Sequence, residues 1–227
     1  MIIGNGLVAS AFATHFDDDK DVIVFASGVS NSRENRAEEF LREDQMLRKC
    51  LLLGKFVIYF STCSVDDPSL RDTPYVNHKK QMELLVSGTE KYAIFRLPQV
   101  VGNTPNPNTL TNYLYQKISS GATFELWRHA RRNLIDVDDV ATIVTYLVRS
   151  ALTHQVTENI VSPFSISMPQ LVRDFELVLG VTANYSVVDA GGTYPIDSGL
   201  AIEVAHRSGV NFDECYIQKI IRKYYGK

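Results

Sequence analysis

The sequence is poor in cysteine: Cys50, Cys63 and Cys215 are the three among 227 residues. They are odd in number and far apart, and no two of them form the Cys-x-x-Cys spacing of a zinc or redox site. This usage argues against a disulfide framework and favours a reducing compartment, so a cytoplasmic location is expected. No metal site is expected.

Long apolar runs and an excess of one charge are also lacking. No stretch holds the ~18 uninterrupted apolar residues that a membrane span requires, and residues 1–6 show no signal-peptide pattern. The formal net charge of -3 argues against a nucleic-acid partner, because such proteins use clustered Lys and Arg to neutralise phosphates. Neither a membrane nor a nucleic acid is therefore expected as a partner.

The remaining composition is that of a globular protein, with 45% apolar and 22% charged residues. The length predicts one large domain, or one domain with a small appended lobe. Apolar segments of strand type alternate with amphipathic segments of helix type, and this alternation predicts a doubly wound, parallel α/β sheet. Strands are expected at 1–3, 22–26, 56–60, 92–97 and 123–127, and helices at 7–16, 33–53, 75–87, 110–120, 138–150, 167–179 and 213–225.

A glycine-containing turn follows the first strand and reads Gly4-Asn5-Gly6-Leu7-Val8-Ala9. Small residues allow a tight turn and a close approach of the backbone to a diphosphate at a helix N-terminus. The position directly after a strand favours a dinucleotide site, and a tight turn without a ligand is the alternative.

A tyrosine and a lysine lie four residues apart, at Tyr75 and Lys79, in a segment expected to be helical. Both side chains then leave the same face of the helix. A nearby ammonium stabilises a phenolate, so the lysine is expected to depress a tyrosine pKa that ordinarily lies near ~10. The pair is a candidate acid–base site.

Small polar residues follow the strand at 56–60, in the order Ser61-Thr62-Cys63-Ser64. They lie at the carboxyl end of a strand, where α/β sheets bind ligands. A basic segment at 128–132 is interpreted as a solvated turn or as a phosphate contact. The segment 17–21 contains four aspartates and is expected to be a solvated turn.

These segments, taken in order, resemble the extended short-chain dehydrogenase/reductase family of sugar-nucleotide epimerases, dehydratases and reductases. The resemblance covers most of the chain. It rests on six segments: Gly4–Ala9, Asp21–Ser27, Phe60–Val65, Tyr75–Lys79 with Glu83, Phe95–Gly102 and Arg132–Ala141.

The resemblance assigns roles to particular residues. It implies that Thr62, Tyr75 and Lys79 are catalytic, and that NAD or NADP is the cofactor. Cofactor contacts are implied at Tyr75 and Lys79, and also at Gly4, Asn5, Gly6, Leu7, Val8, Phe25, Ala26, Ser27, Pro98 and Val100. Nucleotide-sugar contacts are implied at Ser64, Asn103 and Arg132, with a surface salt bridge as the alternative for Arg132. A homodimer through helices 33–53 and 75–87 is a further expectation.

The sequence also departs from the family pattern. The family inserts a strand, a helix and a strand after its first helix, and here Phe16 is followed almost directly by the strand at 22–26. The fold is therefore expected to be a shortened Rossmann-like sheet, and the preference between NAD and NADP cannot be read. The expected division is a dinucleotide-binding core at 1–102 plus 133–150 and a smaller substrate lobe at 103–132 plus 151–227.

Three functions follow from these observations. The first is NAD(P)-dependent reduction of a nucleotide-linked keto-sugar, and the second is 4-epimerisation with a retained cofactor. The third is a non-catalytic binding protein, which the missing strands favour. The usual Tyr-Gly-x-Ser-Lys reads Tyr-Val-Asn-His-Lys here, and His78 is expected to be exposed. Cys63 is expected to be a small, semi-buried residue rather than a catalytic thiol.

Overall fold

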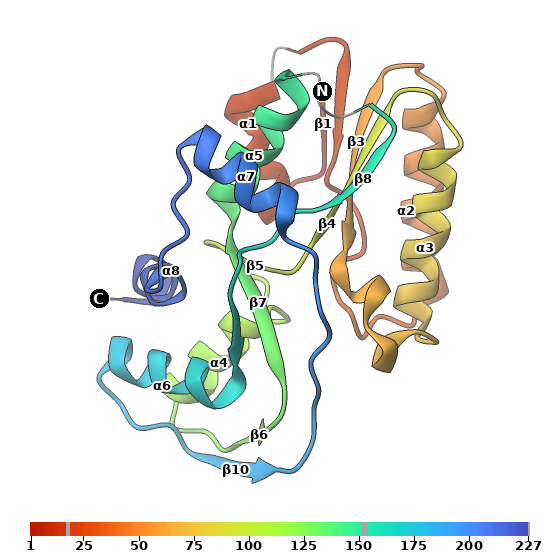
Figure 1. The fold of residues 1–227 in the computed structure, drawn as a ribbon. Helices are drawn as coiled ribbons and strands as arrows, with labels where there is room; N and C mark the ends of the chain where they lie inside the picture. Colours follow the sequence, from red (N-terminus) through yellow and green to blue (C-terminus); the bar gives the residue numbers. More distant parts are fainter. Residues whose placement is uncertain (17–18, 151–153, 227) are drawn as a thin grey trace.

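The fold was analysed in a computed structural model of the chain, which describes residues 1–16, 19–150 and 154–226 (Figure 1). Asp17 and Asp18, part of the expected charged turn, lie outside the described residues. The chain forms a parallel sheet with helices on both faces, and a second group of helices and short strands extends from one end of it. The expected α/β class and the Rossmann-like arrangement are confirmed.

The main sheet has five parallel strands in the order β1-β2-β3-β4-β8. Its strands β2, β3 and β4 are apolar along most of their length, as expected for strands covered on both faces. The strands are β1 (Ile2–Ile3), β2 (Val22–Phe25), β3 (Phe56–Thr62), β4 (Tyr92–Leu97) and β8 (Val156–Asn159).

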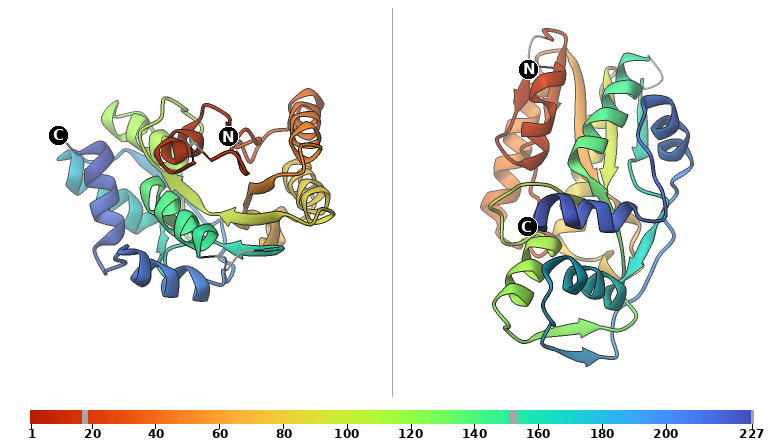
Figure 2. Two further views of the ribbon diagram at one scale, coloured as in Figure 1. Left: turned by 90° about the horizontal axis from the view of Figure 1, so that it is seen from above. Right: turned by 90° about the vertical axis from the view of Figure 1, so that its left-hand side faces the viewer.

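Helices cover both faces of this sheet, and Figure 2 shows α2 and α3 on the side opposite to α1 and α5. Two hydrophobic clusters fill the two interfaces, one around Phe12, Ile58 and Val144 and the other around Leu47 and Tyr59. The helices are α1 (Leu7–Phe16), α2 (Ala37–Leu51), α3 (Pro74–Ser87), α5 (Val137–Arg149) and α7 (Gly199–Ser208).

The main sheet ends at β1, a very short edge strand. β1 has two residues, pairs with β2 alone and is the terminal strand among the described residues. Only residues 17–21 separate α1 from β2, so the chain leaves α1 and enters β2 without further strands. The expected loss of a strand–helix–strand segment is therefore seen in the topology.

The second group of elements has its own core around Leu114, Phe175 and Ile221. It contains the sheet β5-β7-β9, the strand pair β6-β10 and three helices. These elements are β5 (Gln99–Val101), β6 (Phe124–Trp127), β7 (Arg131–Asp136), β9 (Ser165–Ser167), β10 (Tyr185–Val188), α4 (Leu110–Ser119), α6 (Met168–Leu179) and α8 (Tyr216–Tyr225).

Several boundaries differ from those expected. α5 begins at Val137 rather than at 138, and Asp136 caps it, because its side chain accepts a hydrogen bond from the Asp138 amide. α2 begins at Ala37 rather than at 33, and ends at Leu51 rather than at 53. The expected elements contain no counterpart of β5, β7, β8, β9, β10 or α7. The two-part division stays a prediction, although β8 and α7, assigned to the smaller lobe, contact the main sheet and α5.

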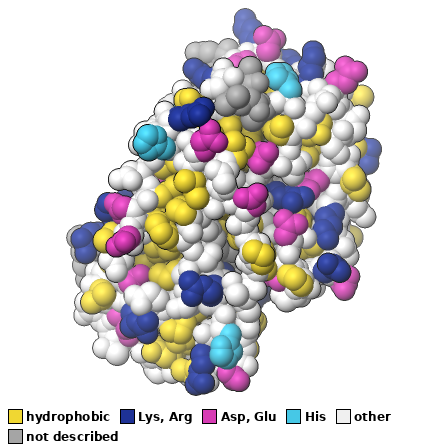
Figure 3. Space-filling view, in the orientation of Figure 1, with side chains coloured by type: hydrophobic (Ala, Val, Ile, Leu, Met, Phe, Trp, Pro, Cys, Tyr) yellow, Lys and Arg dark blue, Asp and Glu magenta, His cyan; other side chains and the backbone are white. Residues whose placement is uncertain are grey.

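The surface is mixed in charge. On the face seen in Figure 3, acidic and basic side chains are interspersed and form no extended basic patch. Within the described part of the chain, no helix is long and apolar enough to cross a bilayer.

Candidate functional site

The glycine turn between β1 and α1 has the geometry that its sequence predicts. Gly4 has φ +126°, and a Cβ atom there would lie 2.5 Å from the Ala26 carbonyl oxygen. Gly6 is exposed, and a Cβ atom there would meet nothing within 4 Å. The first turn of α1 has no acidic residue. The loop therefore fits an anionic group, such as a diphosphate, at the helix N-terminus.

Replacing each of the two glycines with alanine is expected to change the stability of the fold by different amounts. Replacing Gly4 with alanine is expected to cost about 1–3 kcal/mol of stability, because the backbone is left-handed and the methyl group would strike Ala26. The matched variant Gly6→Ala is expected to cost far less. Urea unfolding of both variants measures the difference, and equal losses would show that the loop is not constrained in this way.

Tyr75 and Thr62 meet at the carboxyl end of β3. Thr62 ends that strand, and Tyr75 is the second residue of α3, whose first turn is capped by the Thr73 side chain. The Thr62 hydroxyl accepts a hydrogen bond from the Ser64 amide at 3.2 Å and lies close enough to the Tyr75 phenol to lower its pKa. A phenol and a hydroxyl thus lie together at the edge where such sheets bind ligands.

Lys79 is directed away from solvent and toward a buried carboxylate. Its Nζ lies 2.9 Å from Glu43 Oε1 on α2 and 3.2 Å from the Tyr59 hydroxyl on β3. Glu43 is fully buried, and the Lys79 side chain is 3% exposed. Sequence reasoning did not identify Glu43 or Tyr59.

The prediction that the pKa of Tyr75 is lowered is wrong, because the net shift of this pKa is upward. Burial raises the pKa of Tyr75, and this effect outweighs the lowering by Lys79 and by the Thr62 side chain. Glu43 contributes to the rise, because its charge opposes that of Lys79. The phenol is therefore protonated at neutral pH.

His78 is buried, contrary to the expectation of an exposed residue. Its ring stacks on Phe40 with the centroids 4.7 Å apart, and its Nε2 lies 3.0 Å from Glu43 Oε2. The histidine that replaces the usual serine therefore has a definite partner, the same carboxylate that holds Lys79.

The remaining expected cofactor positions surround the carboxyl edge of β2 and β4. Ala26 and Ser27 follow β2, and Arg42 donates hydrogen bonds to the Ser27 carbonyl and hydroxyl at 3.1 and 3.2 Å. Phe25 is buried against Tyr59. Asn5, Leu7 and Val8 belong to the glycine turn and the start of α1, whereas Pro98 and Val100 are half-buried at the start of the second group.

A cavity of about 480 Å³ lies beside this edge and includes Arg132, one of the three expected substrate residues. Ser64 and Asn103 are not among its lining residues. The lining residues are Asn31, Ser32, Arg33, Gln99, Pro107, Asn108, Leu110, Tyr113, Leu114, Glu125, Trp127, Ala130, Arg132 and Met168.

Tyr194, in the loop between β10 and α7, connects these expected substrate residues. The side chains of Ser64 and Arg132 both lie near enough to its phenol to lower the pKa. Burial is the main reason why the pKa of Tyr194 is raised. No local pattern marks Tyr194, because its loop has neither helical nor strand periodicity. Asn103 is exposed, and nothing in the structure assigns it a contact with these residues.

Cys63 is fully buried, rather than semi-buried as expected, and burial raises the pKa of its thiol to about 12. Its Sγ lies 3.5 Å from the Arg96 carbonyl oxygen. A thiol in this state is protonated at neutral pH and is not a nucleophile.

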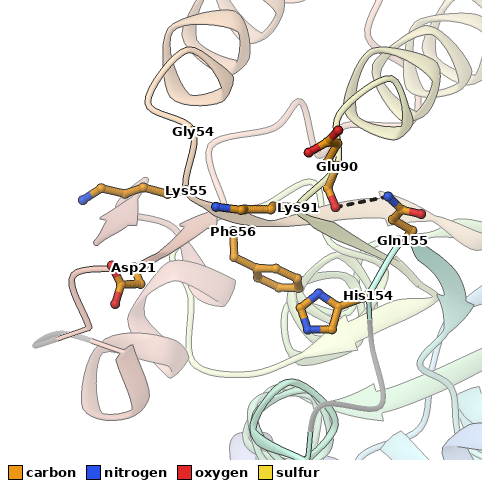
Figure 4. Close-up of a pocket in the computed structure, with 8 residues that line it drawn as sticks. All are labelled: Asp21, Gly54, Lys55, Phe56, Glu90, Lys91, His154 and Gln155. Atoms are coloured by element: carbon orange, nitrogen blue, oxygen red, sulfur yellow. Dashed lines mark hydrogen bonds between the residues drawn. The ribbon is translucent and has the colours of Figure 1, made fainter.

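A second depression, of about 590 Å³, lies at the opposite end of the main sheet (Figure 4). It is formed around the starts of β3, β4 and β8, with the Phe56 and His154 rings 5.4 Å apart. Ligands of α/β sheets bind outside the carboxyl ends of strands, so this depression is not the candidate site. Its lining residues are Asp21, Gly54, Lys55, Phe56, Glu90, Lys91, His154 and Gln155.

Comparisons with known proteins agree with this geometry. Residues 64–160 match the model of the NAD dependent epimerase/dehydratase family. This segment contains Tyr75, Lys79 and Arg132, so the resemblance to epimerases and dehydratases is confirmed over that part of the chain. A search of curated protein sequences gives no match.

Solved structures match the fold over nearly the whole chain. RMD from Pseudomonas aeruginosa, complexed with NADPH, is 13% identical with a TM-score of 0.66, covering 96% of this chain and 85% of that one. A dTDP-glucose 4,6-dehydratase from Streptomyces venezuelae, with NAD and DAU bound, is 16% identical with a TM-score of 0.70, covering 96% and 78%. UDP-glucose 4-epimerase from Thermus thermophilus, complexed with NAD, is 12% identical with a TM-score of 0.66, covering 95% and 81%.

Proposed function

We propose that this chain, whose residues 64–160 match the NAD dependent epimerase/dehydratase family, is an NAD(P)-dependent reductase of a nucleotide-linked keto-sugar. The observation that carries the proposal is the pairing of Tyr75 with Thr62 at the carboxyl end of β3, with the phenol held protonated by its burial. A protonated phenol is suited to give a proton to a carbonyl oxygen as that carbonyl is reduced.

The residues present fit a dinucleotide in part. Gly6 leaves open space for a diphosphate at the N-terminus of α1, and Gly4 lets the turn pack against the backbone of Ala26 after the next strand. A bound nicotinamide would supply the hydride. Tyr75 would give the proton, and the Thr62 hydroxyl would orient the substrate oxygen. Beyond β1, the described residues contain no further strand of the main sheet that would contact the adenosine ribose.

The cavity beside the site supports a nucleotide-linked substrate. A volume of about 480 Å³ falls within the usual range for small-molecule sites. The Arg132 guanidinium is suited to a diphosphate because it can donate two parallel hydrogen bonds. Trp127 and Tyr113 offer aromatic surface to a base.

A second candidate function is that of a binding protein without turnover. The observation that favours it is the hydrogen bond from Lys79 Nζ to the Glu43 carboxylate, which directs the ammonium away from the candidate site. The shortened sheet favours it as well.

The proposal is tested by supplying 4-keto-sugar nucleotides with deuterium-labelled NADH and NADPH. Mass spectrometry of the products is expected to show one deuterium transferred to the sugar as cofactor is consumed in equal amount. Interconversion of 4-hydroxy sugar-nucleotide epimers, supplied in a separate assay, without net cofactor consumption would indicate an epimerase. No reaction with any keto-sugar, by a protein that binds the nucleotide sugar, would contradict the proposal and support the binding protein.

A further inference from the structure

A buried cluster of four polar side chains lies behind the candidate site, between α2, β3 and α3. Glu43 is at its centre, and Tyr59, His78 and Lys79 are hydrogen-bonded to it. All four side chains are buried. Proton transfer by Tyr75 uses none of these groups directly, so their arrangement requires a separate explanation.

Every acceptor position of the Glu43 carboxylate is used. Oε1 accepts from the Tyr59 hydroxyl at 2.7 Å and from Lys79 Nζ at 2.9 Å. Oε2 accepts from the Val29 amide at 2.6 Å and lies 3.0 Å from His78 Nε2. A carboxylate has about four lone-pair sites, so this one is fully satisfied.

The charge state of the cluster follows from these contacts. Burial raises the pKa of Glu43, but Lys79, His78, Val29 and Tyr59 together lower it to about 2. The carboxylate is therefore ionised, and His78 Nε2 must carry the proton in their hydrogen bond. Tyr59 remains a neutral donor, because burial and Glu43 raise its pKa.

The cluster also fixes the loop that follows β2. A Cβ atom on Gly28 would lie 2.7 Å from Lys79 Nζ and 2.9 Å from Glu43 Oε1, so the ion pair is packed directly against this backbone. The Val29 amide is bonded to the same carboxylate. Gly28 follows Ser27 and Ala26, which are expected cofactor positions.

We infer that Glu43 is a positioning residue for the candidate site: it holds the Lys79 ammonium against residues 28–29 and balances its charge. The groups that act on Tyr75 are then Thr62, Lys79, Glu43 and Cys63. Because the Glu43 carboxylate balances the charge of the Lys79 ammonium, the lysine stabilises a Tyr75 phenolate less. Tyr75 then keeps its proton until a substrate oxygen takes it. The inference extends the proposed reductase function, since a reductase requires its tyrosine as a proton donor.

The test is the titration of Tyr75 in the free protein, followed by NMR with carbon-13 at the tyrosine Cζ atoms. The Tyr75 signal is identified by its loss in Tyr75→Phe. Glu43→Gln is expected to lower the titration midpoint of Tyr75 by about one pH unit or more, because it removes a nearby negative charge. An unchanged midpoint would overturn the inference.

Glu83→Gln is the matched control. Glu83 lies on the same helix as Tyr75, is nearly buried and is ion-paired with Arg96 at 2.7 Å, and it is not among the main influences on the pKa of the phenol. Its replacement is expected to leave the Tyr75 midpoint in place. An equal shift in both variants would mean that loss of any carboxylate on this side of the sheet moves Tyr75, which also overturns the inference.

Folding of Glu43→Gln is a separate matter, because the variant leaves a buried ammonium without its partner. If it does not fold, the double variant Glu43→Gln with Lys79→Met is expected to recover the folded state, since both charges are then absent. Failure of the double variant to recover would contradict the pairing. These readouts require no turnover, so they separate this inference from the proposed reductase activity.

Discussion

Replacing Tyr75 with phenylalanine is expected to lower turnover of a keto-sugar nucleotide about 10²–10⁴-fold, the usual contribution of a positioned acid or base. Phenylalanine keeps the packing of the ring against Val29 and Val76 and removes only the hydroxyl that Thr62 contacts. Cofactor affinity is therefore expected to change little. Steady-state rates and calorimetric titration of the same preparations measure the two effects.

A buried tyrosine elsewhere supplies the control for this substitution. Tyr92 starts β4, at the end of the sheet opposite to the site, and is 8% exposed. Tyr92→Phe is expected to retain full turnover. If Tyr75→Phe were as active as Tyr92→Phe on a genuine substrate, Tyr75 would not be the proton donor.

Replacing Lys79 with methionine is expected to cost about 3–5 kcal/mol of stability, because it leaves the buried Glu43 carboxylate without its cation. Urea unfolding measures this loss. Lys80→Met, one residue further along α3 and only half-buried, is expected to change stability by about 0.5 kcal/mol or less. Comparable losses in the two variants would show that the ion pair contributes nothing specific.

The cost of Lys79→Met is expected to depend on pH. The pKa of Glu43 in the folded protein is about 2, below the value of ~4.3 expected when the chain is unfolded. The stabilisation by Lys79 is thus fully present above pH ~4.3 and is lost as the pH falls through about 2. The gap in stability between the wild type and Lys79→Met should narrow over that interval, and a constant gap would contradict the role of Glu43.

The parts of the site that were predictable have local signals. The glycine turn lies between a short apolar strand and a helix, and Tyr75 follows a proline that starts α3. Such signals depend on neighbours in sequence, and the structure contains both features. The alternation of apolar strands and helices likewise predicted the parallel sheet, whereas the shortened first edge was predicted from the departure from the family pattern.

Glu43 was missed because it lies among charged residues in α2, where a solvated face is the ordinary interpretation. A signal was nevertheless present, since Glu43, Leu47 and Cys50 have helical spacing and are the buried residues of α2. In α3, Lys79 is part of a similar stripe with Met82 and Val86. The two stripes face each other across the cluster, and this pairing depends on tertiary structure.

The C-terminal third was the least predictable part. β9 has three residues and β10 has four, so neither is long enough to show a period. Tyr194 reaches Ser64 through a loop, and a contact between residues so distant in sequence has no local signature. The burial of His78 also depends on a partner from another helix, Glu43.

Calorimetric titration of the purified protein with NADH and with NADPH, after a check for cofactor already bound, tests the dinucleotide-dependent function most directly. A dissociation constant in the micromolar range is expected for NADH or for NADPH, which corresponds to a binding free energy of about -8 kcal/mol. Binding would show that the glycine turn and the carboxyl edge of β2 suffice without the missing strands. A folded protein that carries no cofactor and gives no binding heat with either dinucleotide would contradict the reductase and leave the binding protein.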